Sequence, residues 1–157
     1  RFSTNETHSE LWEHIALVKN DYAERGFFLR AESLYNTATY MEQLGLGLLH
    51  DQSHGESFLS VIQDFRGNGL YVLDEPEAAL SPMRQLTLLV EMDTLIKEGA
   101  QFIIATHSPI LMAFPGAQIL EFSNKGIQSV QYQDTEHYRV TKQFLDNPEK
   151  MLHYLLR

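Results

Sequence analysis

Two acidic residues and a histidine follow two apolar segments and have side chains that can bind a metal ion or transfer a proton. Asp74 and Glu75 come directly after the apolar run 70–73, and His107 closely follows the run 102–105. Carboxylate oxygens suit Mg²⁺, and a carboxylate placed beside a water molecule acts as a general base. We therefore expect one acid to reach a Mg²⁺ ion and the other to hold or deprotonate an attacking water.

The elements around these residues predict that they meet in space. Both apolar runs are typical of strands buried on both faces of a parallel sheet. Between them, Pro82–Glu98 has apolar residues at helical spacing, and Gly99 follows as its stop. A strand, a helix and a strand form a right-handed crossover unit, and parallel strands end at the same edge of the sheet. The sequence thus predicts an α/β fold with Asp74, Glu75 and His107 at one rim.

A polar stretch, Ser53-His54-Gly55-Glu56, opens a run with helical apolar spacing that we expect to end at Gly67. Ser53 and Glu56 have the spacing of a capping box, which explains the stretch by helix formation alone. The free amides of a helix N-terminus also bind anions such as phosphate. Both interpretations stay open from these residues alone.

The other motifs also have purely structural explanations. Glu75-Pro76 suits a turn, Ser108-Pro109 suits a helix N-cap followed by proline, and a lone histidine is more often packed or solvated than catalytic. Each explanation is adequate singly. The occurrence of all three in this order on a strand–helix–strand unit favours a functional site.

Composition narrows the class of protein. The chain has 157 residues, 43% of them hydrophobic, which suffices for a buried core, and it has no cysteine for disulfides or thiolate metal sites. It shows no apolar run long enough to span a bilayer and no leader, so we expect a cytoplasmic protein. The net charge of −9, with 12 basic against 21 acidic residues, disfavours broad nucleic-acid binding by this chain.

The remaining segments complete the expected organisation. We expect residues 1–50 to be mainly helical, with helices near Ser9–Asn20 and Ser33–Leu44 and a short extended piece around Gly26–Leu29. Residues 51–157 are expected to form one α/β lobe. In its last part, the segments 117–123 and 126–132 predict a strand hairpin, and the tail from His137 predicts one or two helices.

Three motifs together resemble those of ATP-binding-cassette ATPases. "VLDEPEAALSP" resembles the Walker B strand and the D-loop, and "IIATHSP" is similar to the histidine switch. "QSHGES" lies where the family's signature segment belongs, ahead of Walker B. The motifs span Gln52 to Pro109, and their wording is most similar to poorly characterised bacterial ATPases of the chromosome-maintenance and DNA-repair branch.

This resemblance implies a role for each rim residue. Asp74 would hold Mg²⁺, usually through water, Glu75 would polarise the attacking water, and His107 would contact the γ-phosphate of ATP. The activity implied is ATP binding and Mg²⁺-dependent hydrolysis.

The resemblance also implies a homodimer that sandwiches ATP. Ser53 and Gly55, with His54 and Glu56 in the same signature segment, would face the γ-phosphate of ATP bound to the second subunit. Ser81, at the end of the D-loop, would lie across the dimer interface.

The sequence departs from the family in several places. His54 replaces the first glycine of the signature pair, and Ser81 stands where many members have aspartate. No Gly-Lys pair occurs in the chain, so the P-loop, G-x-x-x-x-G-K-[ST], is absent from these residues. We expect the P-loop lobe to lie outside this chain. The alternative function is a nucleotide-dependent dimerisation switch that hydrolyses little ATP and reports to a protein partner.

Overall fold

The computed structural model describes residues 13–16, 18, 23–31, 54–124 and 126–156. The helices predicted near Ser9–Asn20 and Ser33–Leu44 lie largely or wholly outside these residues. Within the described part of the chain, no helix is both long enough and apolar enough to cross a bilayer.

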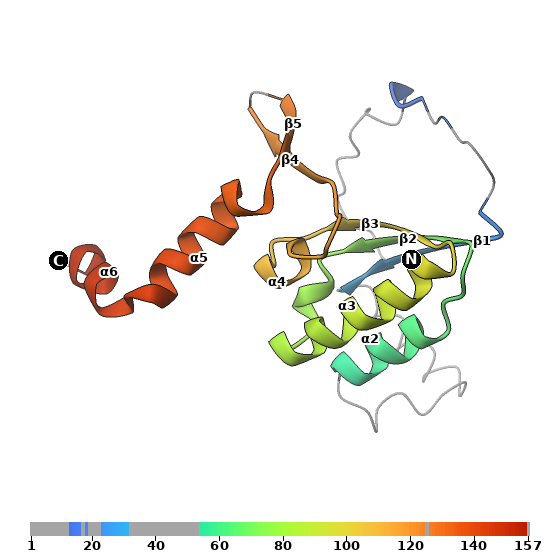
Figure 1. Cartoon of the computed structure of the whole chain (residues 1–157), viewed down its shortest axis with the longest axis horizontal. Helices are drawn as coiled ribbons and strands as arrows, with labels where there is room; N and C mark the ends of the chain where they lie inside the picture. The colour runs from blue at the N-terminus through green and yellow to red at the C-terminus, as the bar shows by residue number, and fades with distance from the viewer. Residues whose placement is uncertain (1–12, 17, 19–22, 32–53, 125, 157) are drawn as a thin grey trace, which may run out of the picture.

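A three-stranded parallel sheet forms the centre of the fold, in the order β1-β2-β3. Its strands are β1 (Arg25–Arg30), β2 (Gly69–Asp74) and β3 (Gln101–Ala105). Helices α2 (His54–Gln63) and α3 (Pro82–Lys97) lie on one face of this sheet (Figure 1). The mixed α/β fold agrees with the predicted class and is consistent with a P-loop NTPase-like fold. Strand β1 confirms the extended piece predicted around Gly26–Leu29, within the segment expected to be mainly helical.

The strand–helix–strand unit forms as predicted, because its ends carry strong local signals. The Ser81 hydroxyl caps α3 by accepting from the Arg84 amide at 3.4 Å, and Pro82 follows as the first helical residue. Gly99 ends the segment at φ +95°, a left-handed backbone that glycine adopts without steric cost. Strand β3 then returns parallel to β2.

The predicted end of α2 at Gly67 is wrong, because the helix ends at Gln63. The Tyr71 hydroxyl accepts from the Arg66 amide and donates to the Arg66 carbonyl, both at 2.7 Å. The Tyr71 ring stacks on Phe65 with their centroids 3.9 Å apart. These contacts pull the chain out of the helix, and Asn68, not Gly67, takes the left-handed conformation, at φ 56°.

The hydrophobic core lies between the sheet and the two helices. It contains Leu29, Phe58, Ile62, Phe65, Tyr71, Leu73, Leu80, Leu88, Met92, Leu95, Ala100 and Leu111. Leu73 in β2 and Leu88 in α3 are fully buried, and burying a side chain of this size contributes about 1.5–3 kcal/mol. The core therefore fixes β2, the strand that carries the acidic pair.

The prediction that the strands are buried on both faces is only half right. The register aligns Phe28, Val72 and Ile103 in a row on the face opposite the helices. Phe28 is 62% exposed and Ile103 52%, because no described helix covers this face (Figure 1). The continuous apolar runs reflect one packed face and one open apolar face.

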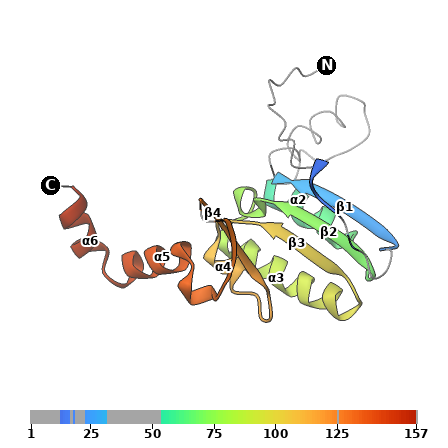
Figure 2. The same cartoon turned by 90° about the horizontal axis from the view of Figure 1, so that it is seen from above.

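The C-terminal part extends away from the sheet. After the short helix α4 (Pro109–Met112), the antiparallel strands β4 (Ile119–Ser123) and β5 (Gly126–Val130) form the predicted hairpin. A 3₁₀ turn at Tyr132–Asp134 leads into α5 (Glu136–Asp146) and α6 (Pro148–Leu155), which confirms the predicted tail helices. Both views show α5 and α6 projecting from the body (Figures 1 and 2).

Candidate active site

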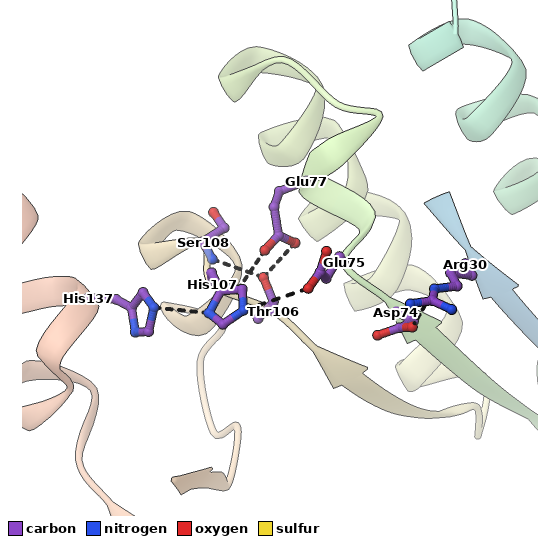
Figure 3. A network of polar contacts seen from close by, with 8 residues as sticks. All are labelled: Arg30, Asp74, Glu75, Glu77, Thr106, His107, Ser108 and His137. Carbon is purple, nitrogen blue, oxygen red and sulfur yellow. Dashed lines mark hydrogen bonds and ion pairs between the residues drawn. The ribbon is translucent and has the colours of Figure 1, made fainter. Parts of the chain in front are cut away.

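The carboxyl ends of β2 and β3 bring the two predicted motifs to one rim. Asp74 and Ala105 are partners in the parallel register, and the Glu75 amide donates to the Ala105 carbonyl at 2.9 Å. The acidic pair therefore lies beside the segment 106–108, about thirty residues later in the chain (Figure 3). This proximity was expected from parallel pairing.

The two acids point to different partners. Asp74 Oδ2 lies 3.1 Å from Nε of Arg30, its register partner at the end of β1. Glu75 Oε1 faces His107 Nε2 at 3.7 Å (Figure 3). Sequence reasoning expected divergent directions but did not identify Arg30, which sits in a segment that carries no recognisable motif.

Glu75 has an unusual backbone. Its φ and ψ of 49° and 51° lie in the left-handed region, which costs a non-glycine residue about 1–2 kcal/mol. The conformation turns the chain from β2 into the 3₁₀ helix η3 (Pro76–Ala78) and leaves the Glu75 side chain 52% exposed. Such outliers cluster at functional sites, where the surrounding structure holds them in place.

Glu77 ties the two motifs together and was missed by sequence reasoning. Its carboxylate accepts from Thr106 Oγ1 at 2.7 Å and from the His107 amide at 2.5 Å. Hydrogen bonds to a charged acceptor are about twice as strong as neutral ones. Glu77 therefore fixes the backbone that carries His107. The only sequence signal for Glu77 was its place in the acidic run after β2, and functional roles in that run were predicted for Asp74 and Glu75 alone.

A buried pair of polar side chains, Ser108 and Gln85, holds the segment 106–108 against α3. Ser108 Oγ donates to Gln85 Oε1 at 2.5 Å, and Gln85 Nε2 donates to the Leu80 carbonyl at 3.1 Å. Both side chains are 7% exposed. Ser108 also caps α4 through the Ile110 and Leu111 amides, so the predicted N-cap is confirmed.

A second histidine contacts His107. His107 Nδ1 lies 3.0 Å from Nε2 of His137, which is in the first turn of α5 (Figure 3). Only the folded chain brings the two residues together, since thirty positions separate them. His137 had been predicted merely as the start of a tail helix.

The structure describes some of the remaining predicted site residues but not all of them. Ser53 lies outside the described residues, and His54, Gly55 and Glu56 form the first turn of α2. A helix start at this motif is thus confirmed, whereas contact with a phosphate stays a prediction. Ser81 is exposed and caps α3, which gives it a structural task besides the predicted one at a dimer interface.

The donor set at the rim fits a Mg²⁺ ion of the kind that binds with nucleotide. Asp74 and Glu75 offer hard carboxylate oxygens on partly exposed side chains, with exposed fractions of 31% and 52%. Within the described ranges, no group of three or more potential ligands could hold a metal by itself. Mg²⁺ typically takes one or two carboxylates from the protein and completes its shell with water and phosphate.

Comparison with known protein families also indicates a function related to nucleotide binding. A family model described as "AAA domain, putative AbiEii toxin, Type IV TA system" matches residues 46–113, less than half of the chain. No curated protein and no solved structure gives a significant match. The matched segment contains α2, β2, α3, β3 and all the rim residues except Arg30 and His137. The match supports an ATPase-type P-loop domain family for this segment.

Proposed function

We propose that this chain supplies the catalytic rim of a dimeric, Mg²⁺-dependent ATPase of the ATP-binding-cassette type, with the P-loop lobe lying outside these residues. The observation that carries the proposal is the meeting of Asp74, Glu75 and His107 at the carboxyl ends of two parallel strands. Ligands bind outside this edge in open α/β sheets.

Each rim residue has a proposed task. Asp74 would help to hold Mg²⁺, which when bound neutralises charge on the phosphates. Glu75, exposed and held by its turn, is oriented to accept a proton from an attacking water. His107 would donate a hydrogen bond to the γ-phosphate. Phosphoryl transfer needs mainly positioning and charge stabilisation, so a small set of residues suffices.

The second subunit completes the proposed site. The first turn of α2 in one copy would offer its free amides to the γ-phosphate of ATP held by the other copy. His54, Gly55 and Glu56 occupy this turn, directly after Ser53. The D-loop residues Ala79–Ser81 would line the interface between the copies.

The decisive experiment compares two glutamate variants of the protein that unites this chain with a P-loop lobe. Steady-state phosphate release should fall at least about 100-fold in Glu75→Gln, in line with the contribution of a general base. Glu136→Gln, an exposed position on α5, serves as the matched control and should retain activity. Unchanged turnover in Glu75→Gln would refute the general-base role. The 157 residues alone should hydrolyse Mg·ATP negligibly.

One observation favours the alternative function, a dimerisation switch with little hydrolysis. Asp74, the proposed metal ligand, is already paired with Arg30 at 3.1 Å, which would weaken cation binding. Size measurements of the united protein with and without ATP separate the two functions. Dimers that form with ATP while phosphate release stays negligible would support the switch.

A further inference from the structure

We infer that His137 is a positioning residue that holds the His107 ring and, together with Glu75, fixes its tautomer and the donor that His107 presents at the rim. The inference rests on the proposed function for its catalytic meaning. The tautomer itself is a property of this chain, independent of ATP. The 3.0 Å contact between His107 Nδ1 and His137 Nε2 is its starting point.

A hydrogen bond between two neutral imidazoles needs one donor and one acceptor. A neutral histidine carries a proton on only one ring nitrogen, and the other nitrogen accepts. Two arrangements therefore satisfy the contact. Either His107 donates from Nδ1, or His137 donates from Nε2 and His107 accepts.

The carboxylate of Glu75 distinguishes the two arrangements. Its Oε1 lies 3.7 Å from His107 Nε2, on the other side of the ring from His137 (Figure 3). If His107 donated from Nδ1, the Nε2 lone pair would face a negative oxygen, which is repulsive. If His137 donates, His107 keeps its proton on Nε2 and directs an N–H toward Glu75. The geometry assigns the second arrangement.

His137 is held firmly enough for this task. Thr135, 3% exposed, caps α5 by accepting from the Tyr138 amide at 3.3 Å, and its hydroxyl donates to the Tyr132 carbonyl at 2.8 Å. The Tyr132 and Tyr138 rings pack edge to face with centroids 4.7 Å apart. Burial, with a smaller effect of Tyr138, raises the pKa of Tyr132, so the Tyr132 hydroxyl stays neutral. The first turn of α5 is thus fixed on both sides of His137.

The two ends of the His107 residue are fixed by different groups. Glu77 holds its backbone amide, whereas His137 and Glu75 bracket its ring. The ring itself is exposed, with 69% of the side chain accessible, so packing alone does not orient it. The polar contact to His137 therefore orients the ring, and Glu75 on its other side keeps the proton on Nε2, which the proposed mechanism needs as a donor to a phosphate oxygen.

Nuclear magnetic resonance of the ¹⁵N-labelled 157-residue chain tests the assignment directly. The spectra are recorded at pH about 8, above the usual histidine pKa of about 6.5. We expect a ¹⁵N–¹⁵N coupling through the hydrogen bond, with the proton on His137 Nε2, and a separate proton on His107 Nε2. A proton on His107 Nδ1, or no coupling between the two rings, would overturn the inference.

Variants test the catalytic consequence in the united protein. His137→Phe keeps a ring but removes the donor, and it should lower kcat about 10- to 100-fold with a smaller change in KM, since misplacement of a reacting group has such effects. His137→Gln retains an N–H donor and should recover part of that loss. His153→Gln, on the neighbouring helix α6, is the matched control.

The outcomes separate this inference from the proposed function. If the wild-type protein hydrolyses no ATP, the ATPase proposal fails, while the coupling measured in the isolated chain still decides the tautomer. If the wild type is active and His137→Phe is equally active while folded, His137 has no positioning role. Circular dichroism of each variant confirms folding.

Discussion

Thr106 Oγ1 donates a 2.7 Å hydrogen bond to Glu77 Oε2, which joins the turn after β2 to the segment after β3. The same carboxylate accepts from the next backbone amide, that of His107. The two strands are already paired, but their register ends at Asp74 and Ala105. Glu77 therefore extends the connection beyond the sheet, to the part of the rim where the chemistry is proposed.

Replacing Glu77 with glutamine should loosen this connection. Glutamine is nearly isosteric but has one acceptor oxygen and no charge, so one of the two accepted hydrogen bonds is lost and the other is weakened. We expect the free energy of unfolding to fall by about 1–3 kcal/mol in urea titrations. Glu149→Gln, exposed on α6, should change it by less than about 0.5 kcal/mol. Equal stabilities of the two variants would contradict this role for Glu77.

The buried pair of Gln85 and Ser108 should be energetically coupled. Gln85→Leu leaves the Ser108 hydroxyl without its acceptor and the Leu80 carbonyl without its side-chain donor, which should cost about 1–3 kcal/mol. The double variant Gln85→Leu/Ser108→Ala should cost less than the sum of the single changes, as measured by a double-mutant cycle. Strict additivity would show that the contact contributes no coupling. Gln143→Leu on exposed α5 is the control.

Neighbouring isoleucines of β3 should respond differently to the same change. Ile104 packs against the core, whereas Ile103 points to the open face and is 52% exposed. Ile104→Thr places a hydroxyl in an apolar setting and should cost about 1–3 kcal/mol of unfolding free energy. Ile103→Thr keeps the β-branched shape and should cost less than about 1 kcal/mol. A similar loss for both would mean that the open face is covered in solution.

Removing Arg30 should strengthen cation binding at the rim. Arg30 is 51% exposed, and a partly exposed ion pair of this kind contributes about 0.2–1 kcal/mol. Arg30→Gln should therefore tighten Mn²⁺ binding, with Mn²⁺ used as a paramagnetic probe for Mg²⁺, by about two- to fivefold. The measurement is Mn²⁺-induced broadening of the Asp74 amide signal. Arg139→Gln should leave the affinity unchanged, and Asp74→Asn should weaken binding.

Patterns local in sequence predicted much of the fold. The apolar runs before Asp74 and Thr106, with the amphipathic helix between them, identified β2, α3 and β3 and placed their ends together. The end of α2 was misplaced because the competing signal was tertiary. Gly67 looks like a helix stop, but the ring of Tyr71, beyond the turn, decides where the chain leaves the helix.

The proximity of the candidate rim residues was predicted from the sequence, and the residues that connect them were not. Asp74, Glu75 and His107 each follow a predicted strand. The parallel pairing of these strands is enough to predict that the three residues lie close together. Arg30, Glu77 and His137 lack such a signal, because their contacts with Asp74, Thr106 and His107 form only in the folded chain. Likewise, an apolar strand sequence cannot show whether both faces of the sheet are covered. The pattern around Phe28 and Ile103 is the same in either case.

The left-handed backbone of Glu75 lowers folding stability, whereas its carboxylate is proposed to act in catalysis. Glycine would relieve about 1–2 kcal/mol there, and asparagine part of it, because both tolerate this conformation better than glutamate does. Substitutions chosen for heat resistance alone would thus favour Gly or Asn at this position, and the carboxylate would be lost. The carboxylate at position 75 therefore comes with a cost in folding stability that the proposed general-base role would offset.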